Sequence, residues 1–177
     1  MSRLLSTSRA RSGRMSLLIL PGAGIADCQI GDSEDFPESR FGPSASKGVM
    51  EDLTILRFPD AGVEVTHMYG FVTDMTFYFN RSKYLNTFDQ DRVVRSMYKG
   101  RVGEGISRNS TENDVITTYG PPDKSYGPLE MWDQSSDEYK TIPGSRERLL
   151  IYNQGISFQF VDDLLIKVTV NKASTDK

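Results

Sequence analysis

Two stretches of this chain follow the same plan, and this duplication constrains the fold more than any other feature. Each stretch ends a polar, acidic segment with a Gly-Pro pair, and the second pair, Gly120-Pro121, follows Gly42-Pro43 by 78 residues. Further on, Gly62 and Gly155 each open an alternating apolar run, and these glycines lie 93 residues apart. Chains that repeat one small structural unit commonly act through the surfaces that the stacked units present.

In the second stretch, the residues before Gly120 predict a short helix. Ser110 or Thr111 is placed to cap its N-terminus, because a hydroxyl oxygen there accepts a free backbone N–H of the first turn. Gly120 suits a left-handed residue at the C-terminal end and Pro121 prevents continuation, so we expect the helix to end near Tyr119.

The first stretch predicts a matching helix, capped by Asp32 or Ser33 and stopped at Gly42-Pro43. It differs at Pro37, which takes the place of a valine in the second stretch. Because proline is tolerated only in the first turn, this helix must be short, shifted or partly irregular.

Alternating apolar residues predict strand pairs after each helix. The positions expected to share a buried face are Val63, Val65 and His67 in the first run, Ile156, Phe158 and Phe160 in the second, and, further on, Met75, Phe77 and Phe79, matched in part by Val168 and Val170. Extending the 93-residue offset backward pairs Leu56 with Leu149. Short turns between the runs indicate antiparallel hairpins. The predicted fold class is α+β, with two tandem repeats, each a short helix packed on a small antiparallel β-sheet.

The predicted organisation follows from these repeats. It comprises a disordered basic tail at 1–14, a first α+β repeat at 15–80, a linker at 81–101, a second α+β repeat at 102–172 with an inserted loop at 123–146, and a short tail at 173–177. The segment 1–14 carries four arginines and no acid, and either Met1 or Met15 is acceptable as the start. The apolar run Leu17–Leu20 is broken by Pro21 and predicts a strand.

Composition limits the classes of partner and compartment. Without the four N-terminal arginines the formal charge of −3 becomes about −7, and an acidic body argues against nucleic acid as a partner. The one cysteine, Cys28, excludes an internal disulfide, and no apolar run is long enough to span a membrane. We expect a cytoplasmic location, with export left open, and no cofactor.

The pattern of short motifs resembles a known superfamily. Gly105-Ile106, Ser110-Thr111, Tyr119-Gly120-Pro121 and Gly155-Ile156-Ser157-Phe158 carry the resemblance, which covers most of the chain from about Leu17 onward. The superfamily includes beta-lactamase inhibitory protein and the small lipoprotein of the bacterial barrel-assembly machinery, and its modules also occur in immunity proteins that neutralise toxins. The resemblance implies the helix-plus-sheet fold and a tendency to bind proteins, without naming a target.

Residues suited to catalysis or metal binding are few. His67 is the one histidine, and its place on an apolar strand face favours a buried, hydrogen-bonded structural residue over a general base. Cys28 would need that same histidine to activate it as a nucleophile, and a buried apolar thiol is the favoured interpretation. Zinc would require two further nitrogen or sulfur ligands that the chain lacks. We therefore predict no metal site and no enzyme.

The insertion in the second repeat is the favoured partner-binding site. It combines aromatic and apolar residues with acids, and its candidate contacts are Tyr126, Met131, Trp132, Asp133 and Tyr139. Tryptophan and tyrosine dominate binding hot spots, and acids favour a basic partner. A second interpretation stays open, in which the loop folds back and Trp132 covers the edge of the sheet.

The predicted function is that of a non-catalytic protein-binding module, of the inhibitor or immunity type, that blocks another protein with a basic surface. Two alternatives stay open. One is a scaffold subunit in envelope assembly, and the other is a small enzyme that uses His67 and Cys28.

Overall fold

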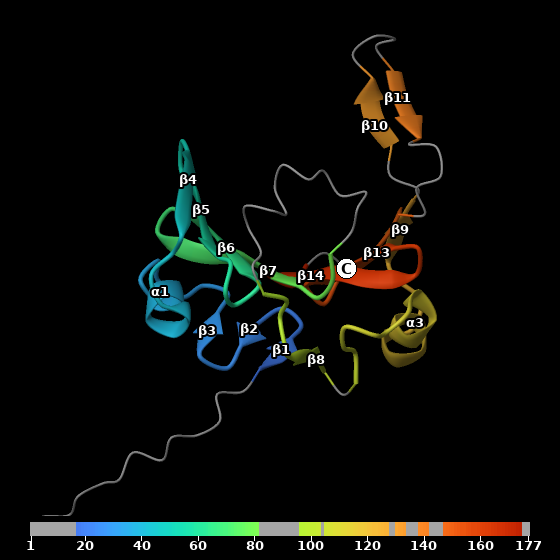
Figure 1. The fold of residues 1–177 in the computed structure, drawn as a ribbon, viewed down its shortest axis with the longest axis horizontal. Helices are drawn as coiled ribbons and strands as arrows, with labels where there is room; N and C mark the ends of the chain where they lie inside the picture. The colour runs from blue at the N-terminus through green and yellow to red at the C-terminus, as the bar shows by residue number, and fades with distance from the viewer. Residues whose placement is uncertain are drawn as a thin grey trace, which may run out of the picture.

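The computed structural model of the chain describes residues 17–81, 96–103, 105–127, 130–133, 138–141 and 147–174. Its main feature is an antiparallel sheet of eight strands in the order β4-β5-β6-β7-β14-β13-β12-β9 (Figure 1). The strands are β4 (Ser46–Met50), β5 (Leu53–Phe58), β6 (Val63–Met68), β7 (Phe71–Tyr78), β9 (Lys124–Tyr126), β12 (Glu147–Tyr152), β13 (Ile156–Val161) and β14 (Leu164–Asn171). The predicted α+β class is confirmed.

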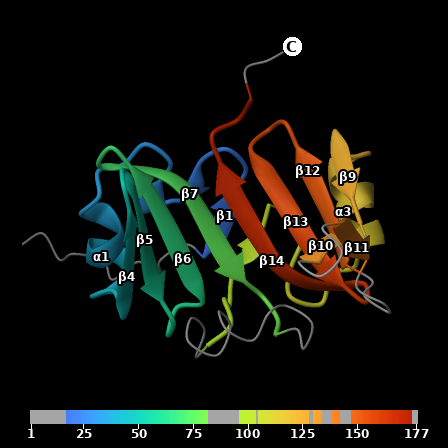
Figure 2. The same cartoon turned by 90° about the horizontal axis from the view of Figure 1, so that it is seen from above.

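Two helices and a smaller sheet lie on one side of the eight-stranded sheet (Figures 1 and 2). The helices are α1 (Phe36–Phe41) and α3 (Glu112–Tyr119), and the smaller sheet has the order β3-β2-β1-β8. Its strands are β1 (Leu18–Leu20), β2 (Gly24–Ile25), β3 (Cys28–Gln29) and β8 (Arg101–Val102), so the strand predicted at Leu17–Leu20 is confirmed. A separate hairpin of β10 (Glu130–Asp133) and β11 (Glu138–Thr141) stands away from the large sheet.

The helix-covered face of the large sheet holds the core. Val65 lies opposite Met75, Met75 opposite Val170, and Val170 opposite Ile156, so one apolar row crosses four strands. These four side chains are at most 1% exposed. The predicted period-two pattern is confirmed, because alternate residues of a strand point to the same face of a sheet.

Helix α3 begins and ends where the sequence predicts. The Thr111 hydroxyl accepts the backbone N–H of Asp114, and the Asp114 carboxylate accepts the N–H of Thr111, which together form a capping box. Gly120 follows with a φ of 81°, a left-handed value that favours glycine.

Helix α1 begins later than predicted. Its N-cap is Asp35 rather than Asp32 or Ser33, and the Asp35 side chain makes no capping hydrogen bond. Pro37 lies in the first turn, where the missing N–H has no cost, so the helix is only six residues long.

The strands of both predicted repeats join into one sheet at the pairing of β7 with β14. This corrects the prediction of two small sheets. Thr76 lies directly opposite Thr169, 93 residues later, and their hydroxyl oxygens are 3.1 Å apart. Register shifts occur between Thr66 and His67 and again between Gln159 and Phe160, which also differ by 93.

The strands that come just before these in the two halves, β5 and β12, are related by a different sequence offset. The turn between β5 and β6 contains four residues and the turn between β12 and β13 contains three, so Phe58 matches Tyr152 at an offset of 94. The Phe58 ring packs on Phe41 at 5.1 Å, and the Tyr152 ring packs on Tyr119 at 5.6 Å. The predicted pairing of Leu56 with Leu149 is therefore wrong by one residue.

The predicted linker contributes to the core at its C-terminal end. Tyr98 is 3% exposed, and its ring packs on Phe77 at 4.8 Å and on Phe79 at 5.7 Å. Its hydroxyl donates to the carbonyl of Leu17. The predicted tail at 1–14 and most of the linker lie outside the described residues.

Candidate protein-binding surface

The face of the large sheet opposite the helices, here called the outer face, carries a polar row across its middle. Arg57 lies opposite Glu64, and the two form an ion pair with a nitrogen–oxygen distance of 3.0 Å. The row continues through Thr76 and Thr169 to Ser157, and each of these residues is partly exposed. This polar composition is typical of a surface rather than of a domain core.

One end of the outer face is apolar instead. Met50, Leu53, Met68 and Phe71 lie directly opposite one another across β4 to β7. The exposed fraction is 70% for Met50, 39% for Met68 and 56% for Phe71, and Tyr69 in the adjoining turn is 72% exposed. We call these five residues the apolar tip. Clustered and exposed large apolar side chains are typical of interaction sites.

The matching row in the C-terminal half of the sheet is more buried. Val161, 93 residues after Met68, is 3% exposed, and Glu147, which matches Leu53, is 4% exposed. Leu164, which matches Phe71, is 40% exposed. The extended exposed row is therefore a property of the N-terminal half and not a general property of this fold.

Acidic residues dominate the segments around the apolar tip. Residues 30–52 contain six acids and two bases; the acids are Asp32, Glu34, Asp35, Glu38, Glu51 and Asp52. Backbone hydrogen bonds hold two of these segments against the turn of the tip, from Tyr69 N–H to the Asp52 carbonyl and from Glu34 N–H to the Gly70 carbonyl. The segments that adjoin the tip therefore carry an excess of negative charge.

A cavity of about 190 Å³, here called the His67 pocket, lies beside α1 and β4. Its lining residues are Glu34, Asp35, Glu38, Lys47, Leu56 and His67. His67 is 2% exposed, and its Nε2 atom has no hydrogen-bond partner among the described residues. Burial lowers the pKa of His67, against an opposing effect of the Glu34 carboxylate, so the imidazole is neutral at pH 7.

The carboxylate of Glu38 is held in its ionised form. The backbone N–H and the hydroxyl of Ser44 both donate to Glu38 Oε1, at 3.0 and 2.8 Å. These hydrogen bonds lower the pKa of Glu38. The His67 pocket therefore combines a neutral imidazole with at least one fixed negative charge.

Cys28 and His67 occupy different surroundings. Cys28 is fully buried in β3, and burial raises the pKa of its thiol to about 12. A thiol with this pKa is protonated at neutral pH and is a poor nucleophile. The His67 pocket does not include Cys28 among its lining residues.

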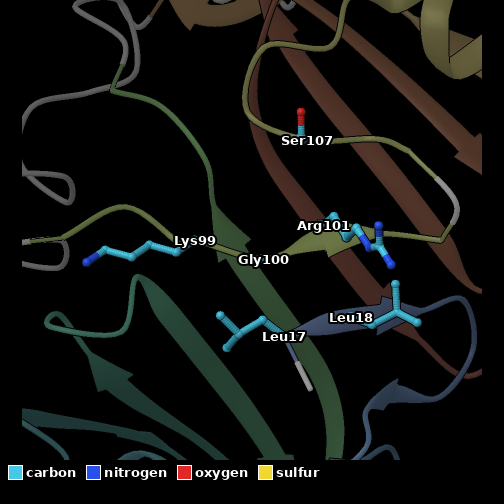
Figure 3. Close-up of a pocket in the computed structure, with 6 residues that line it drawn as sticks. All are labelled: Leu17, Leu18, Lys99, Gly100, Arg101 and Ser107. Carbon is cyan, nitrogen blue, oxygen red and sulfur yellow. The ribbon is translucent and has the colours of Figure 1, made fainter. Parts of the chain in front are cut away.

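A second cavity, of about 440 Å³, lies where β1 pairs with β8 (Figure 3). Its lining residues are Leu17, Leu18, Lys99, Gly100, Arg101 and Ser107. The side chains of Lys99 and Arg101 extend in opposite directions, so they do not converge on one ligand position. Among the described residues that line this cavity, none carries a carboxylate or an imidazole that could act as a general base.

The predicted partner-binding residues fall on three strands. Tyr126 lies in β9 at the edge of the large sheet and is 50% exposed. Met131, Trp132 and Asp133 lie in β10, where Trp132 is opposite Tyr139 of β11. The residues of β10 and β11 form a paired ribbon rather than a structureless loop. Residues 128–129, 134–137 and 142–146 of the insertion lie outside the described residues.

The described part of the chain contains neither a metal-binding cluster nor a membrane-spanning helix. There, no group of three or more histidine, cysteine, aspartate and glutamate side chains is placed to hold a metal ion. Among the same residues, no helix is long and apolar enough to cross a membrane.

The residues of the apolar tip are not among the partner-binding residues predicted from the sequence. The sequence does contain an indication of this surface. Met68, Tyr69 and Phe71 surround Gly70 at a position where a two-residue turn joins two strands. Such turns favour small polar residues, so apolar ones there point to a contact.

Comparisons with known proteins assign no family, because no family model and no curated protein matches the chain. The structure is similar to a cysteine-rich secretory protein of Staphylococcus aureus subsp. aureus Mu50, with a TM-score of 0.44 and 10% identity, over 81% of this chain and 43% of that one. The chain thus spans less than half of that protein. It is also similar to a Streptococcus mutans protein provisionally described as a beta-lactamase inhibitor protein, with a TM-score of 0.25 and 13% identity, over 78% and 82% of the two chains. At these scores the likeness assigns no function.

Proposed function

We propose that this chain is a non-catalytic protein-binding module, of the inhibitor or immunity type, that acts by covering a surface of another protein. The observation that carries the proposal is the apolar tip, where Met50, Met68, Tyr69 and Phe71 are each at least 39% exposed. Burying one large apolar side chain contributes up to about 1.5–3 kcal/mol, so exposed side chains of this kind are suited to act as anchors in a contact.

The partner that suits this surface has apolar recesses surrounded by basic residues. The acids of residues 30–52 surround the tip, and complementary charge speeds encounter and excludes acidic partners. In this mechanism no covalent bond changes, and activity consists of denying the partner access to its own substrate or target.

The proposal includes a duplicated origin for the two halves of the sheet. Support comes from the central pairing of Thr76 with Thr169 and from register shifts that recur after 93 residues. A pairing that relates matching residues by an approximate two-fold axis is expected when two copies of one unit join edge to edge. The copies then diverged, and the N-terminal copy kept the exposed row.

The β10–β11 hairpin is the second proposed contact. It holds Trp132 opposite Tyr139 and Met131 opposite Lys140, and it stands away from the large sheet (Figure 1). The candidate residues of this contact remain Met131, Trp132, Asp133 and Tyr139 in the hairpin, together with Tyr126 in β9. The tip is the main anchor in this scheme, and the hairpin widens the contact.

The test begins with purification of the tagged chain and its bound protein from the native host, followed by affinity measurements with that purified partner. Met68→Glu and Phe71→Glu each place a charge in the tip. We expect each to weaken binding by more than about tenfold, because a buried hot-spot residue contributes about 2 kcal/mol or more. Leu164→Glu is the matched control, since Leu164 lies 93 residues after Phe71 and is 40% exposed.

Removing Glu130–Thr141 and closing the gap with a Gly-Ser linker tests the hairpin separately. A modest loss of affinity fits a secondary contact. If removing the hairpin abolished binding of the partner, while Met68→Glu and Phe71→Glu bound it as tightly as the wild type, the binding site would be the hairpin and not the tip. An enzymatic turnover of the partner that requires His67 would reject the proposed function itself.

A further inference from the structure

Strand β4 forms one edge of the large sheet, and among the described residues its outward side pairs with no strand. Val49 is 62% exposed and Met50 is 70% exposed, and these neighbouring side chains point to opposite faces of the sheet. The β4–β5 hairpin extends beyond α1, so the helix leaves this end of the strand uncovered (Figure 1). An edge that presents free backbone groups between exposed apolar side chains is suited to pair with a further strand.

Gly48, in the middle of β4, is not required by the fold of the single chain. A Cβ atom there would lie 3.7 Å from its nearest neighbour among the described residues, a guanidinium nitrogen of Arg57, which is an ordinary contact distance. Gly48 is also not one of the residues with a positive φ. Glycine weakens the interior of a strand and often marks the close approach of a ligand or another backbone. Gly48 therefore indicates a neighbour outside the single chain.

The sequence of β4 is complementary to itself in one antiparallel register. With Val49 opposite Val49 of a second copy, Met50 lies opposite Gly48, and Lys47 lies opposite Glu51 in the turn after the strand. Opposite residues have side chains on the same face, so Met50 covers the glycine backbone and the lysine ammonium meets a carboxylate. Opposite-charge and apolar cross-strand pairs both stabilise a sheet.

Neighbouring registers lack this complementarity. A register centred on Gly48 places Lys47 opposite Val49, and one centred on Lys47 places two ammonium groups directly opposite each other. Like charges in that position are destabilising. A lysine on an edge strand disfavours strands that offer it no acid, so Lys47 selects the register as well as the occupant.

We propose that the chain forms a two-fold dimer in which β4 pairs antiparallel with β4 of a second copy, centred on Val49. The two-fold axis is perpendicular to the sheet, so the helices of both copies lie on one side of a continuous sheet and both apolar tips lie on the other. This contact goes beyond the proposed function, because it joins two copies of the chain and does not require the other protein.

The first test is sedimentation velocity of the purified full chain over a series of concentrations. We expect a monomer–dimer equilibrium. Val49→Lys should weaken it by more than about tenfold, because it removes two apolar side chains from the new pair and places two like charges opposite each other. Leu164→Lys, the same change at an exposed residue of β14, should leave the equilibrium unchanged.

A charge exchange tests the register. Lys47→Glu and Glu51→Lys each place like charges opposite each other at two symmetric positions, and each should weaken the dimer about fivefold. The double variant, which exchanges the two charges, should restore the wild-type dimer. Both residues are exposed in the single chain, so neither change is expected to disturb its fold.

Disulfide formation gives a second measure of the register. Val49→Cys should yield a covalent dimer under mild oxidation, because opposite residues have Cβ atoms about 4.5–5.5 Å apart. Ser46→Cys, exposed on the same strand, is the matched control, since the two copies of this residue lie about 20 Å apart along the strands. The native Cys28 is fully buried and does not compete.

A monomer at every concentration would overturn the inference, and so would a dimer that persists unchanged in Val49→Lys. Equal cross-linking of Val49→Cys and Ser46→Cys would also overturn it, because that result indicates random collision. If the wild type is monomeric and Val49→Lys loses a protein that co-purifies from the native host, β4 pairs with a strand of that protein and not with itself. These outcomes are separate from the partner affinities of Met68→Glu and Phe71→Glu, which test the proposed function.

Discussion

His67 shows how one residue connects the core of this protein to its surface. It lies on the helix-covered face of β6, in line with Val63 and Val65, yet it faces a cavity with acidic walls. Its burial was predictable from the alternation of apolar residues. The predicted hydrogen bond was not confirmed for Nε2, because the pattern of a strand does not show which groups a helix places above it.

The protonation of His67 makes the stability of the chain depend on pH. Burial lowers the pKa of His67 below its ordinary value of 6.5, so the unfolded chain binds a proton more readily than the folded chain. The stability linked to this residue is therefore present above pH 6.5 and is lost as the pH falls below it.

We predict that His67→Phe removes this pH dependence. Urea unfolding between pH 7.5 and 5.5 should show that the wild-type free energy of unfolding falls relative to that of the variant, by no more than about 1.4 kcal/mol per pH unit. At pH 7.5 the variant should be at least as stable as the wild type, because it loses an unpaired buried nitrogen. Parallel pH profiles for the two proteins would show that His67 does not titrate differently on folding.

At the scale of single elements, the two helices show what local sequence determines. Thr111 and Gly120 set the ends of α3, and both were predicted from residue type alone. In α1, Pro37 lies in the first turn, so the N-cap is Asp35 and the helix is only six residues long. The sequence could not locate that start, because several acids nearby were equally acceptable caps.

We predict that the two N-caps differ in their contribution to stability. Thr111→Ala removes a capping hydrogen bond and should lower the free energy of unfolding by about 1 kcal/mol. Asp35→Ala is the matched change at α1, where the side chain makes no such bond, and should have little effect. Thermal and urea unfolding check both values, and an equal loss in the two variants would contradict the assignment of the capping box.

Across the whole molecule, the strands and hairpins were predictable, but their assembly into one sheet was not. Apolar alternation identifies β6, β7, β13 and β14 and their buried faces, since it records only which side of a strand faces the core. It does not show which strand edges meet, so the pairing of β7 with β14 emerged only in three dimensions.

The candidate site was predictable only in part for the same reason. The insertion was evident because it interrupts the repeat, and part of it forms the β10–β11 hairpin. The apolar tip depends on four strands lying side by side, with Met50 and Phe71 brought together from separate segments. An exposed surface that is assembled from several strands is difficult to recognise in the sequence of any single strand.

The central claim is that the protein recognises its partner through the apolar tip of the N-terminal half. Replacing Phe71 with the photo-crosslinking residue p-benzoylphenylalanine in the native host, with the same replacement at Leu164 as the matched position, tests this claim most directly. We predict one discrete protein adduct from position 71 and none from position 164. An adduct from position 164 alone, or none from either position while the chain still co-purifies with its partner, would contradict the account.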